Sequence, residues 1–291
     1  MKIKKEISSW LFMAPALFVL FFMIWRPQIM GIVWSFFKME GYNVSNFIGF
    51  KNYAEVFSDS EFIKTLLNTF KYVLWSLIIG FIPPVLVAIV LNEMRRCKSF
   101  FKITLYLPSL LPAVSVMLMW YFIYAPDQSG LLNILLGKFG IEPKLWLNNE
   151  SMAIPLIIVS MTWKSMGSAM LLYYAALQGV NTELYEAAII DGAGMLKRAW
   201  HVTLPQISGV LILNFVNQII SVFQIMEQPL TMTGGGPDGA SMSLGLQLYR
   251  YGFVSGRIGH ALALGGIMFV FLLVSTSFYF YLNHKVEQNI G

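Results

Sequence analysis

Long apolar runs separated by shorter polar segments dominate the pattern of this chain. About 20 apolar residues suffice for a helix to cross the hydrocarbon core of a membrane, and six runs reach or approach that length. The pattern therefore predicts an all-α integral membrane protein with six transmembrane helices in a single membrane domain, residues 1–291. The predicted spans cover residues 10–36, 68–91, 103–124, 152–176, 206–227 and 259–282.

The first apolar run needs separate treatment because three lysines within the first five residues precede it, as in a secretory signal peptide. The run from Trp10 to Phe37 is longer than a signal-peptide core, and no small-residue cleavage site follows it. We therefore expect a retained first span. Arg26-Pro27 interrupts this run and predicts a kink or a local defect in its helix.

Composition supports a membrane protein. Hydrophobic residues make up 57% of the chain and charged residues 12%, whereas soluble domains carry about 25% charged residues. The net charge of +5 does not indicate nucleic-acid binding, because no soluble basic face is predicted. A single cysteine, Cys97, excludes an internal disulfide and a cysteine metal cluster, and three scattered histidines argue against a metal site.

Basic residues predict the orientation. Six spans place both termini on one side, and the segments expected there hold ten Lys or Arg against seven in the longer segments opposite. The bias is clearest in the N-terminal segment and in the 92–102 loop, where the positive-inside rule applies best. Both termini and the loop at 177–204 are therefore predicted to be cytoplasmic.

The 177–204 loop is polar and rich in turn-forming residues. Asn181 or Thr182 is placed to cap a short helix, and Asp191-Gly192 ends that helix because glycine tolerates a turn backbone. A second short helix is expected to about His201, and Pro205 suits the first residue of the next helix. The pattern predicts a compact helix–turn–helix between two spans.

This loop resembles a known motif. Glu186-Ala-Ala-x-x-Asp-Gly-Ala, with Leu204-Pro205 ten residues later, is similar to the cytoplasmic "EAA" loop of permease subunits of binding-protein-dependent ABC importers. Trp200 stands where that family commonly has Phe, and Gly209 where it often has a second Pro. The resemblance implies a contact with an ATPase subunit. The residues it assigns to this coupling are Glu183, Glu186, Ala187, Ala188, Asp191, Gly192, Gly194 and Pro205.

Shorter stretches along most of the chain resemble the same family. Thr233-Gly-Gly-Gly-Pro237 is similar to an external loop of carbohydrate permeases, namely the maltose-system type, although this chain lacks the extra external domain of that permease. By itself a triple glycine predicts only a flexible turn. Further matches lie at residues 49–53, 68–69, 107–108, 130–133 and 248–259. Together they imply an importer for a sugar or an oligosaccharide.

The predicted fifth span carries a polar stripe. Six amide or hydroxyl side chains lie at offsets of 0, 3, 4, 7, 10 and 14, within an arc of about 120° on a helix. Uncharged groups that donate and accept suit sugar hydroxyls and a wetted path, but such side chains also bond neighbouring helices. The first five, assigned to the substrate path, are Asn214, Asn217, Gln218, Ser221 and Gln224, and the sixth is Gln228.

Arg26 and Lys164 are cations within predicted spans, and the only acid in these ranges is Glu227, the last residue of its span. Charges at membrane depth are costly and often mark function. Arg26 is placed either to extend its charged end toward the membrane surface or to bind backbone carbonyls at the Pro27 kink. Trp163-Lys164 is similar to a recurrent pair of the permease family, which implies a structural or partner contact for Lys164. Binding of an anionic sugar is the alternative for both.

Motifs of enzymes are missing from the sequence. Gly137-Lys138 lacks the flanking residues of an ATP-binding loop, and neither a His-Glu-x-x-His nor a Gly-x-Ser-x-Gly sequence occurs. We therefore predict that this chain is not an enzyme and holds no cofactor. ATP and magnesium would be bound by partner ATPase subunits.

The sequence thus predicts a permease subunit of a sugar importer in a bacterial-type cytoplasmic membrane. The family implies a second homologous permease, two ATPase subunits and an extracytoplasmic solute-binding protein as partners. A permease for another solute class is one alternative, although the 233–237 loop argues against it. An ion-coupled secondary transporter is another, and it would be expected to show inverted repeats and an intramembrane acid.

Overall fold

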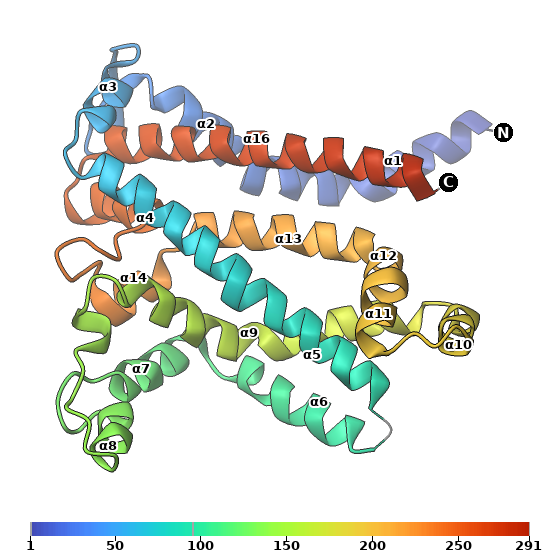
Figure 1. Cartoon of the computed structure of the whole chain (residues 1–291). Helices are drawn as coiled ribbons and strands as arrows, with labels where there is room; N and C mark the ends of the chain where they lie inside the picture. Colours follow the sequence, from blue (N-terminus) through green and yellow to red (C-terminus); the bar gives the residue numbers. More distant parts are fainter. Residues whose placement is uncertain (1, 95, 291) are drawn as a thin grey trace. The chain divides into compact units, whose positions relative to one another are not determined.

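The computed structural model describes residues 2–94 and 96–290, and this part of the chain is predominantly helical (Figure 1). Four helices are long and apolar enough to cross a membrane: Phe12–Trp34, Phe62–Glu93, Ala153–Gln178 and Ile258–Ser277. Two bent pairs complete the set if each counts as one span, which gives the six predicted for this all-α fold. Arg95, one of the basic residues used to predict orientation, lies outside the described residues.

The chain divides into two compact units. The first unit contains the residues up to Phe62 together with Gln247–Phe271, and the second contains Ile63–Leu246 with the segment from Leu272 onward. The first unit comprises α1 (Lys2–Val19), α2 (Arg26–Trp34), β1 (Phe37–Glu40), β2 (Asn43–Phe47), α3 (Lys51–Phe57) and the start of α16 (Ile258–Ile290). A π-helical turn, Leu20–Trp25, joins α1 to α2. The local defect expected at Arg26-Pro27 is therefore a π-helical turn that ends immediately before Arg26.

Strands β1 and β2 form a short antiparallel hairpin, which the sequence did not predict. Asn52 of α3 fixes this hairpin, because its Nδ2 donates to the carbonyls of Ser35 at 2.7 Å and Phe37 at 2.9 Å. Gly259 lets α16 approach, since a Cβ there would lie 2.7 Å from Asn52 Oδ1. The polar segment after the first span is therefore ordered structure.

Asp59 links α3 to the segment before α16. Tyr251 donates a hydrogen bond to its carboxylate, and the guanidinium of Arg257 lies 3.9 Å away. Burial would raise the pKa of Asp59. The hydrogen bonds from Tyr251 and from the Glu61 amide, together with the nearby charges of Arg257 and His260, outweigh that effect and hold the pKa below its usual value. Asp59 therefore stays ionised as a structural anchor.

The second unit contains most of the helices (Figure 1). The second span joins α4 (Phe62–Trp75) and α5 (Ile82–Glu93) through a π-helical turn, Ser76–Phe81. The other helices are α6 (Lys98–Tyr106), α7 (Ala113–Ile123), α8 (Leu131–Gly137), α9 (Ala153–Gln178), α10 (Thr182–Ile190), α11 (Met195–Arg198), α12 (Leu204–Gln206), α13 (Ser208–Phe223), α14 (Glu227–Thr233) and α15 (Leu244–Tyr249).

The core of this unit forms where α9 packs against α5. Ala88 is fully buried there, and so are Met170 and, nearly, Tyr173. A second cluster surrounds Tyr72 and Ile157. Ala88 is a small residue at the contact of α5 with α9, and small residues let apolar helices pack closely in a membrane. α5 and α9 therefore form the frame that carries the loops at their ends.

The third span differs from the single helix expected over residues 103–124. α6 begins earlier, continues through a 3₁₀ turn to Leu110 and meets α7 at an angle of 97°. Pro112 explains the break, because a residue before proline avoids the helical conformation and Leu111 is extended, with ψ of 144°. The apolar composition of this stretch concealed the bend.

The fifth span also differs from its expected range of 206–227. The helix pair that forms it is bent by 78° around Ile207, and α13 ends at Phe223. Ser243 donates to the freed carbonyl of Ile225 at 2.5 Å. Gly245 permits this contact, since a Cβ there would lie 2.6 Å from the same oxygen. A polar side chain and a glycine thus stabilise the end of this span.

We predict that Gly167→Ala destabilises the protein by about 1–3 kcal/mol, because overpacking forces the backbone apart. A Cβ at Gly167 of α9 would lie 2.1 Å from the backbone oxygen of Leu105 in α6. Gly209→Ala is the matched control, because nothing lies within 4 Å of a Cβ there. Thermal melting of the detergent-solubilised protein is the measurement. Equal melting temperatures for both variants would contradict the close packing of α6 on α9.

Candidate functional site

The 177–204 loop folds into α10 and α11 with a glycine turn between them (Figure 1). Asn181 caps α10, since its Oδ1 accepts from the Glu183 amide at 3.0 Å. Gly192 has φ of +76°, a conformation that side chains disfavour. Its amide and that of Ala193 donate back to α10, which closes the turn. Pro205 is the second residue of α12, one position later than expected.

Apolar side chains of this loop are unusually exposed. Ile190 is 85% exposed, Leu196 is 83% exposed and Trp200 is 71% exposed. Large apolar side chains gathered on a polar segment indicate a surface that another molecule covers. The motif residues Glu183, Glu186, Ala187, Asp191, Gly192, Gly194 and Pro205 are also exposed, and Ala188 is half-buried.

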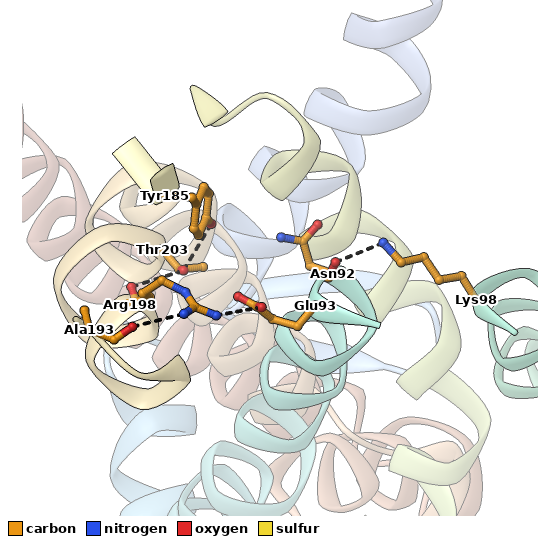
Figure 2. A network of polar contacts seen from close by, with 7 residues as sticks. All are labelled: Asn92, Glu93, Lys98, Tyr185, Ala193, Arg198 and Thr203. Carbon is orange, nitrogen blue, oxygen red and sulfur yellow. Dashed lines mark hydrogen bonds and ion pairs between the residues drawn. The ribbon is translucent and has the colours of Figure 1, made fainter. Parts of the chain in front are cut away.

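Figure 2 shows how the loop is fastened to the end of α5. The guanidinium of Arg198 donates to the Glu93 carboxylate at 2.8 Å and to the Ala193 carbonyl at 3.0 Å. Thr203 connects the Arg198 carbonyl to the Tyr185 hydroxyl on α10. Sequence reasoning did not single out Glu93, and an acid at the end of a span was the only signal for it.

The polar stripe of α13 divides into two groups. Asn214 Nδ2 donates to the Val210 carbonyl of its own helix at 2.8 Å. Gln218 packs on the π-helical turn of the second span, because a Cβ at Gly80 would lie 2.8 Å from its Nε2. Asn217 and Ser221, by contrast, are exposed. Asn214 and Gln218 of the predicted path thus contact other parts of the protein, whereas Asn217 and Ser221 are free to contact another molecule.

The C-terminal end of the stripe does not lie on the expected helix. Gln224 is the residue that follows α13, where its exposed side chain donates to the Ile220 carbonyl at 3.2 Å. Gln228 belongs to α14. The stripe from Asn214 to Gln228 therefore does not lie on a single helix, because the helix is interrupted at residues 224–226.

Lys164 contacts the break of the third span. Its Nζ lies 3.4 Å from the carbonyl of Ser109, in the 3₁₀ turn where that helix ends. Carbonyls at a helix end carry a partial negative charge, which favours a cation. The contact agrees with the structural role that the resemblance implied. Arg26 is exposed, and its guanidinium lies 6.0 Å from the ring of Phe22.

The Thr-Gly-Gly-Gly-Pro loop accepts a hydrogen bond at its Gly236 carbonyl from the Ser241 hydroxyl at 2.6 Å. The residues after the loop, 238–242, are bonded in turn to α4. One face of α4 supplies the bonds: Asn68 Nδ2 donates to the carbonyls of Gly239 and Met242, and Tyr72 donates to that of Ser241. Lys64 donates to the backbone oxygen of Asp238. α4 therefore binds the segment that follows this loop.

We predict that Lys164→Met destabilises the protein by about 1–2 kcal/mol, because a carbonyl at the helix break loses its partner. Lys164→Arg keeps the charge and should melt close to the parent protein. Lys71→Met is the matched control, since Lys71 is an exposed lysine of the apolar helix α4. Thermal melting is the measurement. An unchanged melting temperature of Lys164→Met would contradict the structural role.

Comparison with known proteins identifies close similarity over nearly the whole chain. Residues 80–288 match the family model described as "Binding-protein-dependent transport system inner membrane component". The probable ABC transporter permease protein YurN of Bacillus subtilis is 32% identical, over 93% of this chain and 94% of that protein. The arabinooligosaccharides transport system permease protein AraP of the same organism is 32% identical, over 93% and 86%.

Two further similarities bear on substrate and fold. The trehalose/maltose transport system permease protein MalF of Thermococcus litoralis is 29% identical, over 96% of this chain and 94% of that protein. A chain in the crystal structure of a bacterial alginate ABC transporter, in complex with an alginate pentasaccharide-bound periplasmic protein, superposes with a TM-score of 0.86. It covers 98% of this chain and 96% of its own, at 24% identity, and shows that the fold is shared.

Proposed function

Since the chain belongs to the family of inner membrane components of binding-protein-dependent transport systems, we propose that it is the permease subunit of an ATP-driven ABC importer for a sugar or an oligosaccharide. As a membrane component of a transport system it is a transport subunit and not an enzyme. An ion-coupled secondary transporter does not fit this family.

The exposed 177–204 loop carries the proposal. Ile190 ends the short helix α10 beside exposed motif residues and the Gly192 turn, Leu196 is exposed on α11, and Trp200 is exposed in the turn after it. A short helix with an apolar surface suits a groove on a partner protein. We assign this surface to an ATPase subunit, which would bind ATP and magnesium and hydrolyse the ATP.

The assembly would contain this chain, a second homologous permease, two ATPase subunits and an extracytoplasmic solute-binding protein. Both termini and the 177–204 loop would face the cytoplasm, where the ATPases act. ATP and the loaded binding protein would favour different arrangements of the two permeases, since a ligand shifts an equilibrium only by its differential affinity. Access to the path would then alternate between the two sides of the membrane.

A sugar is supported by two observations. The relatives AraP and MalF are described as permeases for arabinooligosaccharides and for trehalose or maltose. The exposed side chains of Asn217, Ser221 and Gln224 on and beside α13 offer donors and acceptors without charge, as sugar hydroxyls require. We propose that these three side chains line the substrate path, with Asn214 and Gln218 supporting them.

We predict that Gly192→Ala weakens retention of the ATPase about fivefold to thirtyfold, because a left-handed backbone costs about 1–2 kcal/mol for a residue with a Cβ. Gly194→Ala is the matched control, since Gly194 has φ of −67° and open space around a Cβ. Pull-down of ATPase from solubilised membranes with tagged permease is the measurement. Equal retention by both variants would refute a docking role for the turn.

We further predict that Asn217→Leu lowers uptake of radiolabelled arabinooligosaccharides or maltose at least about fivefold, whichever the importer accepts, because loss of a hydrogen bond costs about 1 kcal/mol or more. Melting temperature and ATPase retention should not change, since Asn217 is exposed. Gln218→Leu should instead lower the melting temperature, because Gln218 packs on Gly80. Normal uptake by Asn217→Leu would sink the assignment of this face to the path.

A further inference from the structure

Both ends of the 177–204 loop bind the same turn of α5. At the start of the loop, Gln178, which is also the last residue of α9, donates from its Nε2 to the Asn92 side-chain oxygen at 2.8 Å. Near its end, Arg198 donates to the carboxylate of Glu93 at 2.8 Å. Asn92 and Glu93 are consecutive and close α5. The loop is thus tied at two points to the end of one membrane helix.

The contact of Arg198 with Glu93 is partly buried. The Arg198 side chain is 15% exposed and that of Glu93 is 31% exposed. Charge-assisted hydrogen bonds are stronger than neutral ones, and partial burial reduces screening by salt. The same guanidinium also donates to the Ala193 carbonyl, immediately after the Gly192 turn. One side chain therefore joins the turn, α11 and α5 (Figure 2).

The helix that accepts both contacts, α5, is a continuous helix. α5 runs without interruption from Ile82 to Glu93 and buries Ala88 and Leu91. At its start lies the π-helical turn Ser76–Phe81, where Gly80 receives Gln218 of α13. A π-helical turn inside a helix often marks a functional position. A displacement applied at Glu93 would therefore reach the stripe-bearing helix through α5.

We propose that the Asn92–Gln178 and Glu93–Arg198 contacts form a two-point clamp that transmits movement of the 177–204 loop to α5. The proposal rests on the proposed function, because it takes an ATPase as the source of that movement. A clamp of this kind differs from a docking contact. Its four side chains position the loop on α5, and the ATPase surface consists of the exposed residues around Ile190.

Cys97, the single cysteine, provides a probe in the turn between α5 and α6, where its neighbour Lys98 donates to the Asn92 carbonyl of α5 at 2.9 Å. Cys97 is exposed and lies four residues after Glu93. A spin label on Cys97 of the complete complex reports movement there when ATP and vanadate are added. A second label, on His201→Cys in a Cys97→Ser background, reports movement of the loop itself, because His201 is exposed on that loop. The two labels separate motion of the loop from motion of α5.

The clamp is opened by Arg198→Met combined with Gln178→Leu. Lys197→Met is the matched control, since Lys197 is an exposed cation of the same helix. Exchange of the charges, Glu93→Arg with Arg198→Glu, keeps an ion pair while altering both residues. In the opened variant, the movement reported by the Cys97 label should be at least about fivefold smaller than in the parent complex. About fivefold is the lower bound for a typical coupling between sites. The loop response and ATPase retention should persist.

The control should respond like the parent complex, and the exchanged pair should regain at least about half of the Cys97 response. A full Cys97 response in the opened variant would overturn the clamp. Loss of the loop response or of the ATPase together with the Cys97 response would also overturn it, since the contacts would then only shape the docking surface. Loss of the opened and exchanged variants from the membrane would identify a folding contact and overturn it too.

An unmodified complex that retains no ATPase would contradict the proposed function and remove the basis of the clamp. That result differs from a complex that retains the ATPase and moves the loop label without moving the Cys97 label. The second result contradicts the clamp alone.

Discussion

Backbone groups at the breaks of the membrane helices need partners, and most of the polar side chains at these points can be understood from that requirement. A bilayer offers no water to an orphaned carbonyl, so the protein itself must supply a donor. Lys164 donates to the Ser109 carbonyl at the bend of the third span, and Ser243 donates to the Ile225 carbonyl after α13. Asn68 and Tyr72 do the same for the loop that follows α14.

This requirement separates structural polar residues from those left for other molecules. Lys164, which on sequence grounds was a candidate for binding an anionic solute, contacts a backbone carbonyl of its own chain. Asn217 and Ser221 are exposed on α13, and Ile190 and Trp200 are exposed on the 177–204 loop. The first pair suits a polar solute and the second suits a protein groove. The proposed importer assigns each surface to one of these partners.

Local features of the fold followed from the sequence. The capping side chain of Asn181, the left-handed turn at Gly192 and the helical nature of the chain depend on residues close together in sequence. The bend at Pro112 was missed because an apolar run of about 20 residues predicts a straight span. The hairpin of β1 and β2 was missed because Asn52, which bonds its first strand, lies outside both strands.

Long-range contacts could not be predicted in this way. Glu93 and Arg198 are separated by 105 positions, and neither residue type at its position suggests the other. Gln218 belonged to a regular stripe, and only the π-helical turn at Gly80 shows that it packs inside the protein. Helical periodicity locates a face of a helix, but the neighbour of that face is set by tertiary packing.

Photo-crosslinking from the 177–204 loop tests the central claim most directly. A photoreactive side chain at Ile190, which is 85% exposed, is compared with one at Phe253, which is 71% exposed on the other unit. The complex is irradiated in native membranes, and the adducts are identified by mass spectrometry. The account predicts an adduct between position 190 and an ATPase subunit, with none from position 253. An actively importing complex that gives no ATPase adduct from position 190 would contradict it.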